Sequence, residues 1–135
     1  MVLFDWNNSY SVSVAQFDAD HKKLFRLLNE LNEAMNKRQG EFALKRTLNE
    51  LLAYSTTHFA AEEAAMTWTA YPDLEAHRTE HEKFRQKVTE FTREFESGAK
   101  LLSVDVLFFM RDWLTDHIAK TDKKYSECLN KAGVR

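Results

Sequence analysis

The sequence predicts an all-α fold, an antiparallel up-down-up-down four-helix bundle with an N-terminal arm. The chain has 135 residues but only 3 glycines and 1 proline, whereas an all-β or doubly wound domain of this length needs many more turn-forming residues. Apolar residues recur at helical spacing along the whole chain. The few helix breakers stand far apart, so the links are short and successive helices should be antiparallel neighbours.

Each of the four expected helices carries its own apolar stripe. The first helix starts beside two aspartates, Asp18 and Asp20, and either is suited to cap it. Gly40 separates the first helix from the second, Pro72 suits the first turn of the third, and Gly98 follows the end of the third. The expected helices span residues 19–38, 41–66, 73–97 and 103–129.

The chain is expected to form a single domain over residues 1–135. This length is enough for one hydrophobic core and too short for two comfortable ones. Residues 1–17 should form an arm that is too apolar for a disordered tail. We expect this arm to pack along the bundle, which occupies residues 19–129.

Charge and hydropathy argue against several classes of function. The net charge is −2 and no basic patch stands out, so a nucleic-acid partner is not expected. The longest uninterrupted apolar run, residues 106–110, is far too short to span a membrane, and the first residues do not resemble a secretory signal. Cys128 is the single cysteine and cannot form an internal disulfide. These observations predict a cytoplasmic protein.

Histidines interrupt the apolar stripes. When each stripe is extended by helical steps, all five histidines and one glutamate fall on faces that should be buried. Unpartnered imidazoles and a carboxylate would destabilise a core, so a metal centre is the natural compensation. The alternating helix directions place these residues at the same end of the bundle. The residues are His21, His58, Glu62, His77, His81 and His117.

The spacings within the helices are those of metal ligands. His58 and Glu62 form an i,i+4 pair, as do His77 and His81, so both members of each pair face inward. His117 and Asp122 are five residues apart, which is about 140° around an ideal α-helix. We therefore predict local unwinding or a π-bulge between His117 and Asp122 if both face the same site.

These seven positions resemble the ligand signature of the hemerythrin family in order and in spacing, and the resemblance covers nearly the whole chain. Asp20 stands where glutamine is usual, and Ala70 stands where glycine is usual. Neither is a ligand position, so the differences concern loop geometry more than metal binding. The motifs that resemble the bacterial branch of the family are Trp6, Asp18-x-x-His21-Lys22, Leu24-Phe25, His58-Phe59-x-x-Glu62-Glu63-x-x-Met66, Tyr71-Pro72 and Trp113-Leu114-x-x-His117-Ile118.

The resemblance implies two non-haem irons that bind O2 reversibly. By this resemblance, His77, His81 and His117 hold one iron, and His21 and His58 hold the other. Glu62 and Asp122 bridge both irons, together with an oxo or hydroxo group. If both irons prefer about six ligands, the two-histidine iron keeps one open position, where O2 would bind. No residue needs to act as an acid or base, so the chain is not expected to be an enzyme.

An apolar O2 pocket should adjoin the open position, because a dry wall disfavours proton delivery. Five apolar residues lie within four positions of a ligand in the sequence, and all of them also fit an ordinary helical core. By the resemblance, Leu114 is expected nearest to O2. The five pocket residues are Leu24, Phe59, Trp113, Leu114 and Ile118.

Other functions compete with reversible O2 binding. A di-iron oxidase or peroxidase is less favoured, because the chain has no Glu-x-x-His motif. An O2-sensing or regulatory module would need a partner protein, since 135 residues leave no room for a signalling domain. A mononuclear zinc site needs only about four ligands, and a metal-free bundle would need every histidine satisfied by other means. Delivery, storage, sensing and scavenging of O2 would look alike in the sequence.

Overall fold

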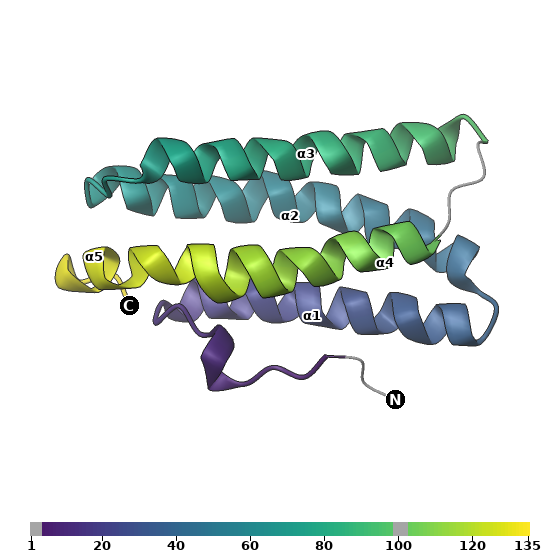
Figure 1. Cartoon of the computed structure of the whole chain (residues 1–135), viewed down its shortest axis with the longest axis horizontal. Coiled ribbons are helices and arrows are strands. Elements are labelled where there is room, and N and C mark those ends of the chain that lie inside the picture. The colour runs from purple at the N-terminus through teal and green to yellow at the C-terminus, as the bar shows by residue number, and fades with distance from the viewer. Residues whose placement is uncertain (1–3, 99–102) are drawn as a thin grey trace.

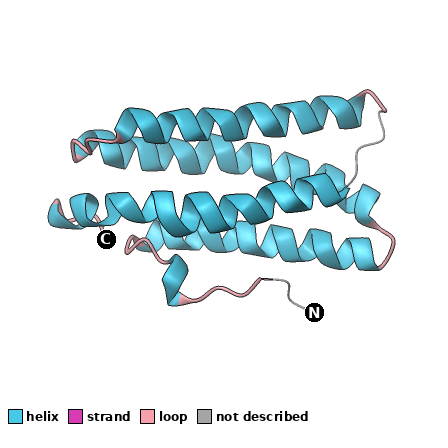
Figure 2. Cartoon of the chain, viewed as in Figure 1, coloured by secondary structure: helices cyan, strands magenta, loops and turns pink. Residues whose placement is uncertain are grey.

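The structure is a computed structural model that describes residues 4–98 and 103–135. Four helical rods lie side by side and alternate in direction (Figure 1), which confirms the predicted antiparallel four-helix bundle. The described residues contain no strand, and nearly all of them are helical (Figure 2). The elements are η1 (Asn8–Tyr10), α1 (Ala15–Asn36), α2 (Gly40–Trp68), α3 (Leu74–Glu96), α4 (Ser103–Asp112), η2 (Trp113–Thr121), η3 (Asp122–Tyr125) and α5 (Ser126–Lys131).

The fourth rod is a composite of α4, η2, η3 and α5. Its central part, η2, is π-helical over 9 residues, and η3 is a short 3-10 turn. The other three rods are continuous α-helices of 22, 29 and 23 residues. The expected helices match them, with ends that differ by up to four residues.

Helix α1 begins earlier than expected, and the predicted aspartate cap is wrong. Its N-cap is Val14, which makes no side-chain capping hydrogen bond. Asp18 lies inside the first turn and instead accepts hydrogen bonds from Ser11 Oγ at 2.6 Å and the Val12 backbone N–H at 2.8 Å. Asp18 therefore fastens the end of the arm to α1. The extra helical turn forms because Phe17, which we expected in the arm, is buried on the inner face of α1.

The arm packs along the bundle beside α1, as expected (Figure 1). The Trp6 and Tyr10 rings meet the Phe25 ring edge-on, with centroids 5.4 Å and 4.7 Å apart. The side-chain amide of Asn29 also hydrogen-bonds the backbone of Phe4 in both directions. These contacts explain the apolar character of the arm.

Two connections have constrained backbones. Gly40 opens α2 instead of merely separating two helices, and a Cβ there would lie 2.9 Å from Met35 Cγ. Close packing of α2 against the end of α1 therefore favours glycine at this position. Between α2 and α3, Ala70 adopts a φ of 55°. This left-handed conformation favours glycine, the residue usual there in the resembling family.

The buried apolar residues form two clusters with a polar layer between them. The larger cluster fills most of the bundle and contains all five predicted pocket residues. The smaller cluster closes one end and includes Phe17, Met66, Tyr71, Tyr125 and Leu129. Along every rod, the predicted ligands fall between residues of the two clusters. No helix in the described ranges is long and apolar enough to cross a bilayer.

Candidate metal centre

The polar layer contains all seven residues predicted as metal ligands. Each of them is buried, with no more than 3% of its surface exposed. They come from α1, α2, α3, η2 and η3, so every rod of the bundle contributes. The side chains form two groups that share Glu62, and in each group the ligand-type atoms lie within 4.8 Å of one another. The two-histidine group is His21, His58 and Glu62, and the three-histidine group is Glu62, His77, His81, His117 and Asp122.

Glu62 lies between histidines of the two groups. Its Oε1 atom is 3.2 Å from the Nε2 atoms of both His58 and His81. Its Oε2 atom is 3.7 Å from Nε2 of His21. The Nε2 atoms of His21 and His58 face each other at 3.1 Å. One carboxylate therefore reaches imidazoles from three different helices.

Asp122 also spans the two groups. Its Oδ1 atom is 2.9 Å from the Nε2 atoms of His77 and His117. Its Oδ2 atom is 3.2 Å from Nε2 of His21. Neighbouring ligands on an octahedral ion with bonds of about 2.1 Å are roughly 3.0 Å apart. The donor atoms are thus spaced as the ligands of a common ion would be.

The π-helical segment brings Asp122 to the site. The backbone N–H of Asp122 bonds to the carbonyl of His117, five residues earlier. This i→i+5 hydrogen bond widens the turn, so residues five apart return to nearly the same face of the helix. The predicted local departure from α-helix between His117 and Asp122 is confirmed.

Most of the buried polar atoms that lack a hydrogen-bond partner in the described structure face the centre of this layer. A native core leaves few such atoms, because each one lowers stability. A cation would use them, since imidazole nitrogens and carboxylate oxygens are its ligands. The residues therefore fit a metal centre. The unpartnered atoms that face inward are Glu62 Oε1, His77 Nε2, His81 Nε2, His117 Nε2, Asp122 Oδ1 and Asp122 Oδ2.

The charges in the layer shift its pKa values strongly. Burial alone would lower the pKa of His21, but the hydrogen bonds and charges of Asp122 and Glu62 raise it to about 10. Burial likewise opposes the rise of the His117 pKa, which Asp122 brings to about 9. Burial, and for Asp122 the Glu62 charge, would raise the pKa of both carboxyls, yet the facing imidazoles hold both pKa values well below the usual range. The carboxylates of Glu62 and Asp122 thus stay anionic, and the layer needs compensating positive charge. Protons on the imidazoles or a bound cation would supply it.

A second layer of carboxylates lies behind three of the imidazoles and was not predicted from the sequence. Each carboxylate lies on the rod that comes before the rod of its histidine in the chain. In the sequence it stands directly beside a ligand-type residue of its own helix, and adjacent helical residues point about 100° apart. Such carboxylate–histidine pairs orient a ligand and raise its basicity. His58 Nδ1 donates to Asp20 Oδ2 at 2.8 Å, His81 Nδ1 donates to Glu63 Oε2 at 2.9 Å, and Glu80 Oε2 lies 3.5 Å from His117 Nδ1.

A tyrosine on the smaller-cluster side was also missed. The Tyr125 hydroxyl donates to Glu62 Oε2 at 2.5 Å, and the residue is fully buried. Its position three residues after Asp122 in the sequence was the available signal. Tyr125 fixes the carboxylate that the two groups share.

The five predicted pocket residues lie together in the larger cluster, beside the polar layer. Phe59 stacks on the His81 ring at 3.8 Å between centroids, and Trp113 stacks on the His117 ring at 3.7 Å. Leu24, Leu114 and Ile118 are fully buried. The predicted wall would not be purely apolar, because Trp113 contributes a buried indole N–H.

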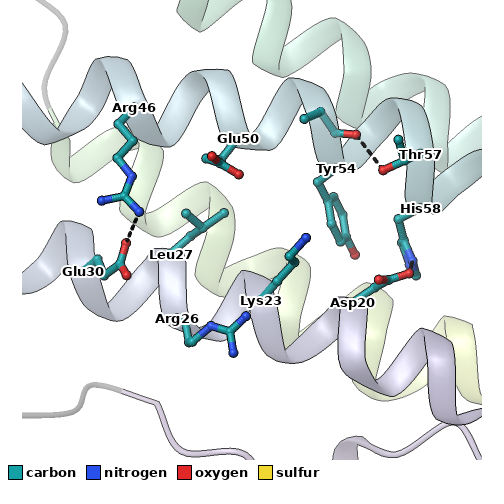
Figure 3. Close-up of a pocket in the computed structure, with 11 residues that line it drawn as sticks. Asp20, Lys23, Arg26, Leu27, Glu30, Arg46, Glu50, Tyr54, Thr57 and His58 are labelled. Carbon is teal, nitrogen blue, oxygen red and sulfur yellow. Dashed lines mark hydrogen bonds and ion pairs between the residues drawn. The ribbon is translucent and has the colours of Figure 1, made fainter.

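A surface cleft of about 190 Å³ lies between α1 and α2 (Figure 3). Tyr54 and His58 lie toward one end with Asp20, and the ion pair of Glu30 with Arg46, 3.8 Å apart, lies toward the other (Figure 3). The His58 ring stacks on the Tyr54 ring, with centroids 4.7 Å apart. Charged side chains of both signs line the cleft, so its chemistry favours neither anions nor cations.

The Tyr54 hydroxyl is buried and has no hydrogen-bond partner in the described structure. Burial first, and then the charges of Glu62 and Asp122, raise the pKa of Tyr54 well above its usual value, so the phenol stays protonated. The neighbouring Trp113 indole N–H opposes this rise in the Tyr54 pKa, because it would stabilise a charged phenolate oxygen. The two side chains are thus close, but they do not meet the geometry of a hydrogen bond.

Comparison with known proteins, both by sequence and by fold, finds the hemerythrin family that the sequence motifs resemble. Residues 12–129 match the family described as hemerythrin HHE cation binding domain. A bacteriohemerythrin from Methylococcus capsulatus is 33% identical, and the alignment covers 96% of this chain and 99% of that protein. A hemerythrin-like protein from Naegleria gruberi is 32% identical, with 93% of each chain covered.

Solved structures of hemerythrins have the same fold as this chain. A crystal structure of wild-type hemerythrin superposes with a TM-score of 0.81 at 32% identity and covers 94% of this chain and 98% of that one. The crystal structure of a hemerythrin point mutant superposes with a TM-score of 0.82, also at 32% identity, and covers 96% of this chain and 98% of that one. Sequence, fold and the arrangement of the polar layer lead to one conclusion: the chain belongs to the hemerythrin family.

Proposed function

We propose that this protein binds O2 reversibly at a di-iron centre in the polar layer. His77, His81 and His117 would hold one iron, and His21 and His58 would hold the other. Glu62 and Asp122 would bridge them. The two irons would supply the electrons for O2 binding, and a protein of this kind would serve as an oxygen carrier or store.

One observation carries this proposal: two carboxylates each reach histidines of both groups. Glu62 Oε1 is equally close to His58 and His81, and the two oxygens of Asp122 face His21 on one side and His77 on the other. A single ion does not need seven ligand residues, whereas two bridged ions do. The set therefore favours a dinuclear centre over a mononuclear site.

The unequal histidine numbers favour ligand binding on the two-histidine side. With both bridges shared equally, the two-histidine iron has one protein ligand fewer. We expect the five pocket residues to exclude water there. Leu24, Leu114 and Ile118 are fully buried, and the rings of Phe59 and Trp113 cover imidazoles of the adjoining three-histidine group. A dry wall slows the loss of bound oxygen as peroxide. This arrangement favours reversible binding over catalysis.

The test is iron analysis followed by O2 titration of the reduced protein. We expect about two irons per chain, as seven ligand residues require. We expect a visible spectrum that forms when O2 is added and reverts when O2 is removed. Absence of bound iron after anaerobic loading would overturn the proposal. Sustained consumption of O2 or peroxide with turnover would instead favour a di-iron oxidase or peroxidase.

A further inference from the structure

One carboxylate of the second layer is itself paired with two arginines. Glu63 Oε1 lies 3.3 Å from Arg78 Nε, and Glu63 Oε2 lies 3.5 Å from Arg85 Nη2. The same Oε2 atom accepts the Nδ1 hydrogen bond of His81. Two guanidinium groups therefore share the carboxylate that supports one ligand-type imidazole.

The other two carboxylates of the second layer differ from Glu63. Asp20 lies behind His58, and Glu80 lies behind His117. Among the described residues, neither of them forms an ion pair with a lysine or an arginine. The Glu63 side chain is also the most shielded, at 19% exposed against 28% for Asp20 and 43% for Glu80. Charges interact more strongly where less water screens them, so the arginine charges should reach the polar layer through Glu63.

Arg85 approaches His81 by a second route as well. Its guanidinium lies over the Phe59 ring, 5.4 Å from the ring centroid. The Phe59 ring in turn stacks on the His81 ring, with 3.8 Å between centroids and 3° between planes. Arg85 thus contacts both side chains, Glu63 and Phe59, that support the His81 imidazole from outside the polar layer.

Further contacts fix the Arg85 side chain, which is only 35% exposed. Nη2 donates to the Ser55 carbonyl at 3.4 Å, and Nη1 lies 3.5 Å from Glu82 Oε2. Glu82 is 58% exposed, so water screens its charge more than that of Glu63. A lone surface ion pair contributes little, because a long side chain must be ordered to form it. Arg85 is ordered by four contacts at once, for which a planar guanidinium with several donors is suited.

We propose that Arg85 is a positioning residue that makes His81 a weaker electron donor to the iron it would hold, and thereby raises the reduction potential of that iron. A carboxylate behind an imidazole raises its basicity, and a guanidinium on the same carboxylate opposes this effect. A fixed positive charge nearby also disfavours the loss of an electron from ferrous iron. The inference rests on the proposed function, in which the reduced centre is the form that binds O2.

The test is a potentiometric titration of the iron-loaded protein with dithionite and redox mediators, followed by the visible spectrum, after iron analysis of each variant. Arg85→Met removes the charge and keeps most of the length of the side chain. We expect its reduction potential to fall by about tenfold in the one-electron equilibrium constant, which is about 59 mV. Arg85→Lys keeps the charge, so its potential should stay near that of the wild type.

Arg93→Met is the matched control, because Arg93 is an exposed arginine of the same helix, α3, and forms no ion pair among the described residues. Its potential should equal that of the wild type, although the net charge changes equally. A wild-type potential in Arg85→Met would overturn the inference. An equal fall in Arg85→Lys would also overturn it, because lost packing would then be the cause.

A second measurement needs no iron. The free energies of unfolding of metal-free Arg85→Met, Glu63→Gln and the double variant form a double-mutant cycle. Side chains in contact give non-additive effects, and we expect this for Arg85 and Glu63. Additive effects would show that Arg85 does not act on Glu63 and would overturn the inference.

The outcomes separate this inference from the proposed function. Lack of iron in the wild type defeats the proposed function, whatever the double-mutant cycle shows. A loaded wild type whose reduction potential is matched by Arg85→Met leaves the di-iron centre standing and defeats only the role of Arg85.

Discussion

The two histidine groups are supported to different degrees. In the three-histidine group, carboxylates stand behind His81 and His117, and the rings of Phe59 and Trp113 stack on the same two imidazoles. In the two-histidine group, Asp20 and the Tyr54 ring support only His58. The outward nitrogens of His21 and His117 both lack a hydrogen-bond partner in the described structure, but His117 has the Glu80 carboxylate 3.5 Å away.

If the proposed function is correct, this difference distinguishes a side that holds its iron firmly from a side where O2 binds, called here the holding side and the reacting side. Imidazoles that are fixed by a second contact lose little freedom when they bind a metal, so the three-histidine group is the more preorganised. The two-histidine group has fewer supports, which suits exchange of a small ligand in the proposed centre. Glu62 and Asp122 connect the two sides.

The largest expected effect comes from removing one of the two shared carboxylates. Asp122→Ala deletes the oxygens that face His21, His77 and His117 and leaves those buried imidazoles without their carboxylate, so both sides should lose iron. Iron analysis after anaerobic loading is the measurement, and exposed Asp112→Ala is the control. Full iron content in Asp122→Ala would show that Asp122 is not a shared ligand.

The next effect concerns the pocket on the reacting side. Leu114→Ala should speed autoxidation, because a cavity admits water, and should lower the free energy of unfolding by about 2–5 kcal/mol. Leu129→Ala is a matched control, since Leu129 is also fully buried but lies in the smaller cluster. It should lose similar stability and keep the wild-type autoxidation rate. An unchanged rate in Leu114→Ala would argue against Leu114 as a pocket wall.

A paired substitution sharpens the comparison of the two sides. Asp20→Asn should weaken iron on the two-histidine side, and Glu63→Gln should weaken iron on the three-histidine side, each by about 10- to 100-fold. The reason is that each substitution removes the negative charge that accepts the Nδ1 hydrogen bond of His58 or His81 and makes that imidazole a better ligand. Competition with a chelator, followed spectroscopically, should resolve which iron leaves first. Identical release from both variants would contradict separate roles for the two carboxylates.

The smallest expected effect is a release of protons. At pH 7.5 the metal-free protein should hold protons on His21 and His117, whose pKa values are raised to about 10 and about 9. Imidazoles must be neutral to bind iron, so loading should release about two protons per chain. Calorimetry in buffers of different ionisation enthalpy measures this number. The release should vanish above pH 10, and no release at pH 7.5 would contradict the raised pKa values.

The same shifts predict how the metal-free protein responds to alkali. Because the folded-state pKa of both histidines lies above the ordinary value of 6.5, their stabilisation is complete below about pH 6.5. It is lost as the pH rises through about 9 and 10. Melting temperatures of the metal-free protein should therefore fall across this range.

Sequence reasoning located the helices and the polar layer because both follow from local spacing. His77 and His81 share a face through the i,i+4 rule, and the odd spacing of His117 and Asp122 required the π-helical turn that the structure contains. The start of α1 was predicted less well. Asp18 resembles a cap in sequence, but its real partners are in the arm, at Ser11 and Val12.

The second layer could not be assigned in the same way. Asp20, Glu63 and Glu80 each adjoin a ligand-type residue, which was a usable signal. Adjacent helical residues point about 100° apart, so a residue beside an inward-facing ligand does not itself face the centre of the bundle. Its carboxylate then lies either in solvent or against a neighbouring helix. The packing of the rods decides between these outcomes, because it sets which imidazole comes within hydrogen-bond reach.

The sequence by itself determined the all-α bundle, the five buried histidines and the need for a break in the last helix. These features depend on periodicity and burial, which can be read along one chain. Only the tertiary structure decided that Asp122 faces both histidine groups, that Tyr125 holds Glu62 and that Asp20 lies behind His58. The reason is that each of these relations joins side chains from different rods, and their distances depend on how the rods pack.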